Sequence, residues 1–166
     1  MATIVQVAGK ITVSVGMGDS AAEELGFTRN GVQYTEEGFY GDVPGDEYGG
    51  DEGPPIDVQY FGEVHRIRCE LTKYDATVAK RVAAKVAGAA AGTPADPGTL
   101  YFAQAKYMRV VCSGTNPAGV NHVRNYPYCI PRMPIELNAG TKFSTLVIEF
   151  EAHKKPGQST MYTETV

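Results

Sequence analysis

The sequence predicts a mainly β fold, a β-sandwich or small barrel of about seven strands flanked by one α-helix. Runs of β-branched and aromatic residues recur between turn residues, and the 166-residue chain contains 19 glycines and 10 prolines, which favour turns over long helices. One segment has helical periodicity, and a single amphipathic helix needs a sheet to cover. We expect one domain over residues 1–152, with an extended loop at 38–55, and a C-terminal arm over residues 153–166.

Two hairpins are expected in the first 35 residues. The β-rich runs Thr3–Val7 and Ile11–Val15 are separated by three residues, which suits a tight turn. Asn30 and Gly31 form the preferred centre of a type I′ turn, so Gly26–Tyr34 is predicted as the second hairpin.

The longest alternating segment is Ile56–Thr72, which is predicted as a strand with one apolar and one charged face. Gly62 lies where a β-bulge could turn the strand. The apolar face is expected to carry the following residues: His65, Ile67, Cys69 and Leu71.

A helix is predicted directly after this strand. Asp75 is a suitable N-cap residue for a helix over Ala76–Ala87. Val78, Val82 and Val86 repeat at a spacing of four and form a narrow apolar stripe.

The second half of the chain is expected to alternate between strands and loops. Leu100–Cys112 reads as a strand and Ser113–Asn125 as a loop. Tyr126–Leu137 contains three prolines, which indicates an edge or irregular segment. Thr141–Ala152 is apolar on both faces, which predicts a central, covered strand.

Charge and composition exclude several classes of protein. The net charge of −4 argues against tight, sequence-independent binding of nucleic acid, which needs a basic surface. No run of 18 apolar residues predicts a membrane-spanning helix, and the N-terminal residues do not resemble a signal peptide. The three widely spaced cysteines, Cys69, Cys112 and Cys129, are expected to be buried, reduced thiols, although one disulfide remains an alternative.

Catalytic and cofactor motifs are not found in the sequence. His65, His122 and His153 lack a metal-ligand spacing, and there is no GxSxG elbow or phosphate-binding loop. We therefore expect a non-enzymatic protein without cofactor or bound metal, with His65 as a packed or interface histidine.

The stretch from Asp42 to Glu52 is acidic, rich in glycine and flanked by aromatic residues. Its acids could bind calcium, but they lack the EF-hand spacing. It could also be a solvated loop, whereas the aromatic residues favour an inter-subunit arm because they gain most from contact. The residues expected in this inter-subunit loop are Phe39, Tyr40, Asp42, Asp46, Glu47, Tyr48, Asp51 and Glu52.

The chain resembles tail tube proteins of tailed bacteriophages. The resemblance is carried by GPPIDVQYFGEVHRIRCELTKYD (Gly53–Asp75), the helix that follows, and RNYPYCIPRMPIELNAGTKFSTLVIEFE (Arg124–Glu151). It covers about two thirds of the chain and consists of order and spacing, with no invariant chemical motif. The resemblance implies a β-sandwich that forms hexameric rings, a barrel continued between subunits around a lumen, and a long loop that reaches the neighbouring ring.

From this resemblance we expect a virion structural protein whose stacked rings form a hollow conduit for DNA. Its partners would be further copies of itself, other tail proteins such as sheath, terminator or baseplate, and passing DNA that it does not bind tightly. It would be made in the host bacterial cytoplasm and reside in the virion tail, with no membrane partner. Alternatives are a capsid decoration or head–tail connector protein, and a calcium- or carbohydrate-binding β-sandwich module.

Two further sets of residues are expected to contribute to assembly. The charged face of the long strand would line the channel or an interface through Arg66, Arg68 and Glu70. The acidic loop would dock on basic residues of a neighbour, for which the candidates are Lys80, Arg81 and Lys85.

Overall fold

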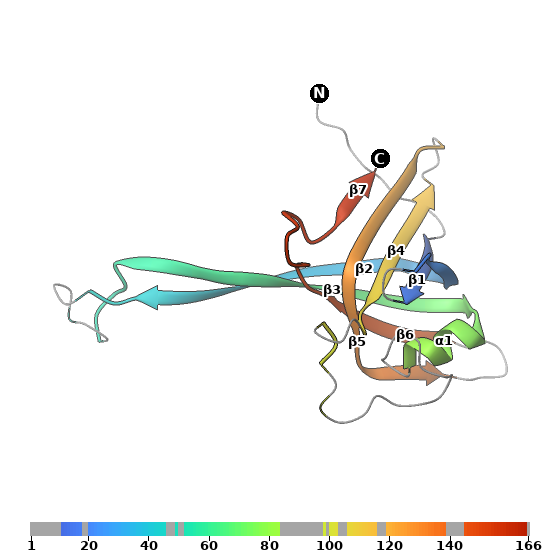
Figure 1. The fold of residues 1–166 in the computed structure, drawn as a ribbon, viewed down its shortest axis with the longest axis horizontal. Coiled ribbons are helices and arrows are strands. Elements are labelled where there is room, and N and C mark those ends of the chain that lie inside the picture. The colour runs from blue at the N-terminus through green and yellow to red at the C-terminus, as the bar shows by residue number, and fades with distance from the viewer. Residues whose placement is uncertain are drawn as a thin grey trace.

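A computed structural model of the chain describes residues 11–17, 20–45, 49, 52–83, 98, 100–102, 106–115, 119–138 and 145–165. Within these residues the chain is mainly β, as predicted, with one short helix (Figure 1). The elements are β1 (Ile11–Met17), β2 (Glu23–Val43), β3 (Asp57–Tyr74), α1 (Ala76–Ala83), β4 (Met108–Thr115), β5 (Asn121–Asn138), β6 (Thr145–Ala152) and β7 (Thr163–Thr165).

The strands close into an antiparallel barrel. They are hydrogen-bonded in the order β4-β1-β2-β3-β6-β5-β7, and β4 also pairs with β5. Because β4 also pairs with β5, the strands β4, β1, β2, β3, β6 and β5 form a closed barrel. Strand β7 pairs with β5 and is not part of this closed series. Closure leaves no free edge around the barrel itself, which removes the sites where sheets associate without specificity.

A two-stranded hairpin extends beyond the closed barrel. Strands β2 and β3 are longer than the barrel, and together they project from it as a two-stranded hairpin (Figure 1). We call residues 38–62 the arm. Helix α1 lies at the end of the molecule remote from the tip of the arm (Figure 1).

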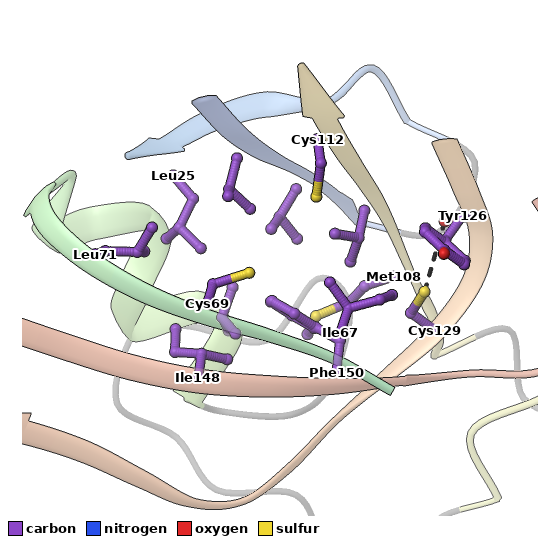
Figure 2. Close-up of a cluster of buried hydrophobic side chains, with 14 of the residues drawn as sticks. Leu25, Ile67, Cys69, Leu71, Met108, Cys112, Tyr126, Cys129, Ile148 and Phe150 are labelled. Carbon is purple, nitrogen blue, oxygen red and sulfur yellow. Dashed lines mark hydrogen bonds between the residues drawn. The ribbon is translucent and has the colours of Figure 1, made fainter. Parts of the chain in front are cut away.

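The barrel interior is filled by apolar side chains from β1, β2, β3, β4, β5, β6 and α1 (Figure 2). The predicted alternation of β3 is confirmed, because His65, Ile67, Cys69 and Leu71 are all buried. The remaining core side chains are Val13, Val15, Leu25, Val78, Val82, Met108, Val110, Cys112, Tyr126, Cys129, Leu146, Ile148, Phe150 and Ala152.

The three cysteines are buried free thiols in this core, as expected (Figure 2). Cys69 and Cys129 are fully buried, and Cys112 is 2% exposed. Burial raises the pKa of the Cys129 thiol well above its ordinary value, since the low-dielectric interior disfavours the thiolate. The Cys129 side chain therefore acts as a small apolar residue of the core.

The second predicted hairpin, at Gly26–Tyr34, is wrong. These residues belong to one continuous strand, β2. The register steps from Thr28 opposite Leu71 to Val32 opposite Cys69, so the extra residues around Asn30 form a bulge. Gly31 supplies the positive φ of 84° that Asn-Gly pairs favour, but pairing with β3 on both sides of the bulge keeps the strand continuous.

The predictions for the second half also need correction. Residues 100–102 are not part of a strand, because β4 begins at Met108, and Phe102 instead stacks on Tyr128 with 4.3 Å between ring centroids. The predicted loop Ser113–Asn125 is wrong at both ends, since β4 continues to Thr115 and β5 begins at Asn121.

Strand β5 is not an edge strand. It pairs with β4, β6 and β7, although it contains three prolines. Pro127 and Pro134 lie where the registers with β4 and β6 shift, and Pro131 lies beyond the last pair with β4. Prolines are tolerated here because the hydrogen-bonded ladders are interrupted at the register shifts, and Pro131 has no partner on β4.

Two other predicted elements fall partly outside the described residues. Thr3–Val7 lies outside them, whereas its predicted partner Ile11–Val15 is in β1. Of the predicted strand Thr141–Ala152, residues 145–152 form β6, which is central because it pairs with β3 and β5. Residues 153–165 follow β6 and return to the barrel, where β7 pairs with β5.

The N-cap prediction is confirmed. The Asp75 carboxylate oxygen Oδ1 accepts hydrogen bonds from the backbone N–H groups of Thr77 (2.8 Å) and Val78 (2.9 Å). The side chains of Val78 and Val82 then enter the core, so the cap fixes where α1 closes the end of the barrel.

Replacing this cap should cost a measurable amount of stability. We expect Asp75→Ala to lower the free energy of unfolding by about 1 kcal/mol, because two helix N–H groups lose their acceptor. Asp75→Asn keeps an acceptor oxygen, so we expect this variant to retain most of the stability that the cap contributes. Urea denaturation of the three proteins measures both effects, and equal losses in the two variants would contradict the role of the cap.

Candidate functional site

The arm is the part of the described structure with the strongest signs of a contact site. It carries six large apolar side chains that are 46% to 66% exposed: Phe39, Tyr40, Ile56, Val58, Tyr60 and Phe61. Soluble proteins seldom gather so many exposed apolar groups on one element unless that element meets a partner. The arm is therefore the candidate functional site.

The cross-strand register assigns the arm side chains to two faces. Tyr40 pairs with Tyr60, and Asp42 pairs with Val58, so these four residues share one side, which we call the tyrosine face. The Tyr40 and Tyr60 ring centroids are 5.5 Å apart.

The other side, which we call the phenylalanine face, holds Phe39, Gly41, Gln59 and Phe61. Gly41 pairs with Gln59, and the Phe61 ring lies where a Cβ of Gly41 would be. Apolar side chains are thus exposed on both sides of one thin ribbon.

A bulge at Gly62 separates the arm from the barrel, as the sequence predicted. Phe39 pairs with Gly62 and Tyr40 with Tyr60, so Phe61 is the extra residue of β3. Gly62 has φ of +128°, a conformation that glycine adopts without strain. The bulge places Phe61 over Gly41 and sets the direction in which the arm leaves the barrel.

The glycines of the arm make room for its large side chains. A Cβ on Gly38 would come within 2.8 Å of the Tyr40 ring, and one on Gly41 within 2.3 Å of the Phe61 ring. A Cβ on Gly45 would come within 2.5 Å of Ile56. The combination of glycine and aromatic residues in the sequence is thus a packing arrangement, in which apolar side chains lie flat over glycine backbone.

Both backbone edges of the arm are unpaired in the described structure. Strand β2 pairs with β1 only as far as Phe27, and β3 pairs with β6 only from His65 onward. A two-stranded hairpin with open edges and no covered face is marginally stable in water. The arm therefore depends on the barrel at its base and gains most from a partner along its length.

Charged side chains fix the base of the arm. Buried His65 has Nε2 3.2 Å from Glu63 Oε1, and its Nδ1 is 3.9 Å from Glu36 Oε1. Arg66 reaches Glu37 Oε2 across the strands at 3.0 Å. The contacts with Glu36 and Glu37 join β3 to β2 where the arm leaves the barrel, and burial confirms His65 as a packed histidine.

A hollow of about 620 Å³ lies beside this base. Tyr60, Glu63 and His65 line it from the arm side, and Lys154, Met161 and Tyr162 line it from the C-terminal segment. The hollow lies between the arm and the C-terminal segment.

The predicted charged face of β3 is matched by acids within the same subunit. Arg66 pairs in register with Glu151 and Arg68 with Glu149, both on β6. Glu151 is buried and accepts a hydrogen bond from Arg132 Nε at 2.7 Å. Glu70 meets Asn30 Nδ2 at 3.5 Å. The face therefore carries no large excess of positive charge.

The other predicted site residues divide into described and undescribed ones. Asp42 and Glu52 are exposed on the arm. Asp46, Glu47, Tyr48 and Asp51 lie outside the described residues. Lys80 and Arg81 lie on α1, but their side chains are not described, and Lys85 lies outside the described residues.

Sequence reasoning missed the contacts that hold the C-terminal strand. Glu164 of β7 accepts hydrogen bonds from Arg124 Nε at 2.8 Å and from His122 Nε2 at 2.5 Å, both on β5. The Arg124 guanidinium lies over the rings of Tyr34 (4.6 Å) and Tyr162 (4.9 Å). No short motif announces this cluster, because its members are brought together by strand pairing.

Among the described residues, no group of three His, Cys, Asp or Glu side chains is arranged to hold a metal ion. The same residues contain no helix with the length and apolar character that a membrane span requires. Comparison with protein-family models gives no match, and comparison with curated proteins gives none.

The Glu164 cluster should make stability depend on pH. Arg124 and His122 lower the pKa of the Glu164 carboxyl, so the ionised form stabilises the fold above the ordinary carboxyl pKa of about 4.3. That contribution is lost as pH falls through the lowered value. Because Glu164 is one-third exposed, we expect Glu164→Gln to cost less than about 1 kcal/mol at pH 7.

Urea denaturation at pH 7 and pH 3 measures this effect. The difference between wild type and Glu164→Gln should shrink as the pH falls from 7 to 3, because the Glu164 carboxylate is protonated as the pH passes through its lowered pKa. Glu52→Gln, which changes an exposed carboxylate of the arm, is the control and should have little effect at either pH. An equal loss for Glu164→Gln at both pH values would contradict the ion-pair explanation.

Proposed function

We propose that this chain is a virion structural protein of the tail tube type, a non-enzymatic subunit that assembles into stacked rings around a conduit for DNA. The single observation that carries the proposal is the projecting arm, with apolar side chains exposed on both faces. The resemblance of Gly53–Asp75 and Arg124–Glu151 to tail tube proteins supports the same conclusion, as does the barrel fold.

The energetics of the arm favour a permanent contact. Burying a large apolar side chain from water stabilises by about 1.5–3 kcal/mol. Six such side chains are about half exposed, so burying their remaining surface in a contact would contribute roughly 5–9 kcal/mol of free energy. A structural subunit realises this free energy when it assembles, whereas a monomeric protein would carry the same surface as an aggregation risk.

The placement of charge favours a second copy as the partner. Residues 38–62 contain six carboxylates and no basic residue, whereas α1 carries Lys80 and Arg81 and no acid. The outer ends of β2 and β3 in the arm lie at the opposite end of the long axis from α1, so one subunit cannot bring the arm onto its own helix (Figure 1). A contact between the arm of one copy and the helix of the next joins different surfaces, and such a contact repeats into rings or filaments.

The barrel fits the role of a wall segment. Its strands are closed, its core is densely apolar, and its β3 arginines are balanced by acids in register. With a net charge of −4, such a wall would not hold phosphates tightly. In this role the partners are further copies of the chain, other tail proteins at the tube ends, and DNA in transit. The site of action is the virion tail.

Shortening the arm tests the proposal directly. Deletion of residues 46–51 should leave the barrel folded but abolish stacked tubes, because it removes three of the six carboxylates that the arm offers to the basic helix of the next copy. Negative-stain electron microscopy of concentrated protein measures assembly, and circular dichroism measures folding. The matched control removes the six residues 92–97, a stretch of equal length with one acid instead of three, and should still assemble.

A second variant addresses the docking partner. Lys80→Glu combined with Arg81→Glu should also prevent stacking, because acidic arm residues would then face acids. If the protein that lacks residues 46–51 still forms tubes, the proposed role of the arm is wrong. A wild-type protein that stays monomeric at high concentration, even with tail initiator components, would contradict the function itself.

A further inference from the structure

We propose that the arms of neighbouring copies pack on one another, the tyrosine face of one arm against the phenylalanine face of the next. Each arm would then contact two other arms. This inference rests on the proposed function and specifies the contact within a ring, whereas the tip and α1 form the contact between rings.

The first support is that both faces of the arm are apolar and exposed. Tyr40, Val58 and Tyr60 are more than half exposed on one face, and Phe61 is 64% exposed on the other. The barrel covers neither face, because the arm projects away from it (Figure 1). A partner that covered one face would leave the aromatic side chains of the other in water.

The second support is that the described surface offers no other matching apolar patch. Eight large apolar side chains are exposed among the described residues, and six of them lie on the arm. The remaining two are Leu100 and Val120, which come from different segments. Among the described surfaces of the chain, a second arm therefore presents the exposed apolar side chains that could cover the first arm.

The third support is the difference between the two faces. A contact of tyrosine face with tyrosine face would be two-fold symmetric, and it would leave the phenylalanine face of both arms exposed. A contact between unlike faces uses both, and it can repeat around a closed ring until no arm face is free. Ring closure therefore accounts for an element that is apolar on both sides.

The charge of the arm gives this contact a distinct salt dependence. Arms that pack together bring like charges close. Asp42 lies on the tyrosine face, whereas Asp57, which pairs with Val43, lies on the phenylalanine face. The arm contains no basic residue that could offset these charges. Salt screens this repulsion and should strengthen arm–arm packing. Salt should weaken the contact of the acidic tip with the basic helix, so that high salt converts stacked tubes into separate rings.

Cross-linking of two single variants tests the face pairing. Val58→Cys places a thiol on the tyrosine face. Gln59→Cys changes the next residue along β3 and places a thiol on the phenylalanine face. The native cysteines are at most 2% exposed and should not react. Assembled protein is treated with a short bis-maleimide whose reach is below the ~10 Å that separates packed sheets, and dimers are counted on denaturing gels.

An equimolar mixture of the two variants should give at least five-fold more cross-linked dimer than either variant alone. Dimer from Val58→Cys alone at the level of the mixture would overturn the inference in favour of two-fold packing. Rings seen by electron microscopy without cross-links in the mixture would overturn it in favour of docking on a barrel. If the wild-type protein forms no rings at all, the proposed function fails first, and this inference fails with it.

Discussion

The antiparallel ladder between β2 and β3 is the constraint on which the rest of the structure depends. It runs from Gly26 opposite Tyr74 in the barrel to Val43 opposite Asp57 in the arm. In the barrel each of these strands has a second neighbour, β1 or β6, and buries one face in the core. In the arm the same ladder continues with no further strand beside it among the described residues, so one element combines a stable anchor with an exposed contact surface.

The transition between these two parts is built from a few residues. The bulge at Gly62 turns the ribbon, and the contacts of His65 and Arg66 with glutamates of both strands hold its base. A stiff base matters because a contact made far from the barrel would otherwise lose conformational entropy on docking. The barrel thus positions the arm, and the arm presents glycine-supported aromatic side chains to a partner.

The sequence was sufficient where a local pattern and the tertiary environment agree. The alternation of His65, Ile67, Cys69 and Leu71 predicted the buried face of β3, and Asp75 predicted the start of α1. The composition of residues 38–58 also predicted an exposed, aromatic and acidic element. It did not reveal that this element is a pair of strands, because Asp and Gly are poor strand formers and the ladder is imposed by register from the barrel.

The sequence was insufficient where non-local pairing outweighs local preference. Asn30 and Gly31 favour a turn, yet pairing with β3 on both sides makes them a bulge. The prolines of β5 argue against a paired strand, yet they fall where its partners change. The contacts of Glu164 with Arg124 and His122 join segments about forty residues apart, which no local pattern indicates.

The central claim is that the arm is an intermolecular contact element, and hydrogen exchange of its backbone amides tests it most directly. Residues 38–43 and 57–62 should exchange rapidly in the dilute monomer, because no described strand pairs with either edge of the arm. In concentrated, assembled protein the same amides should become protected by at least ten-fold, while core amides of β3 and β6 change little. Equal exchange of the arm amides in monomer and assembly would contradict the account.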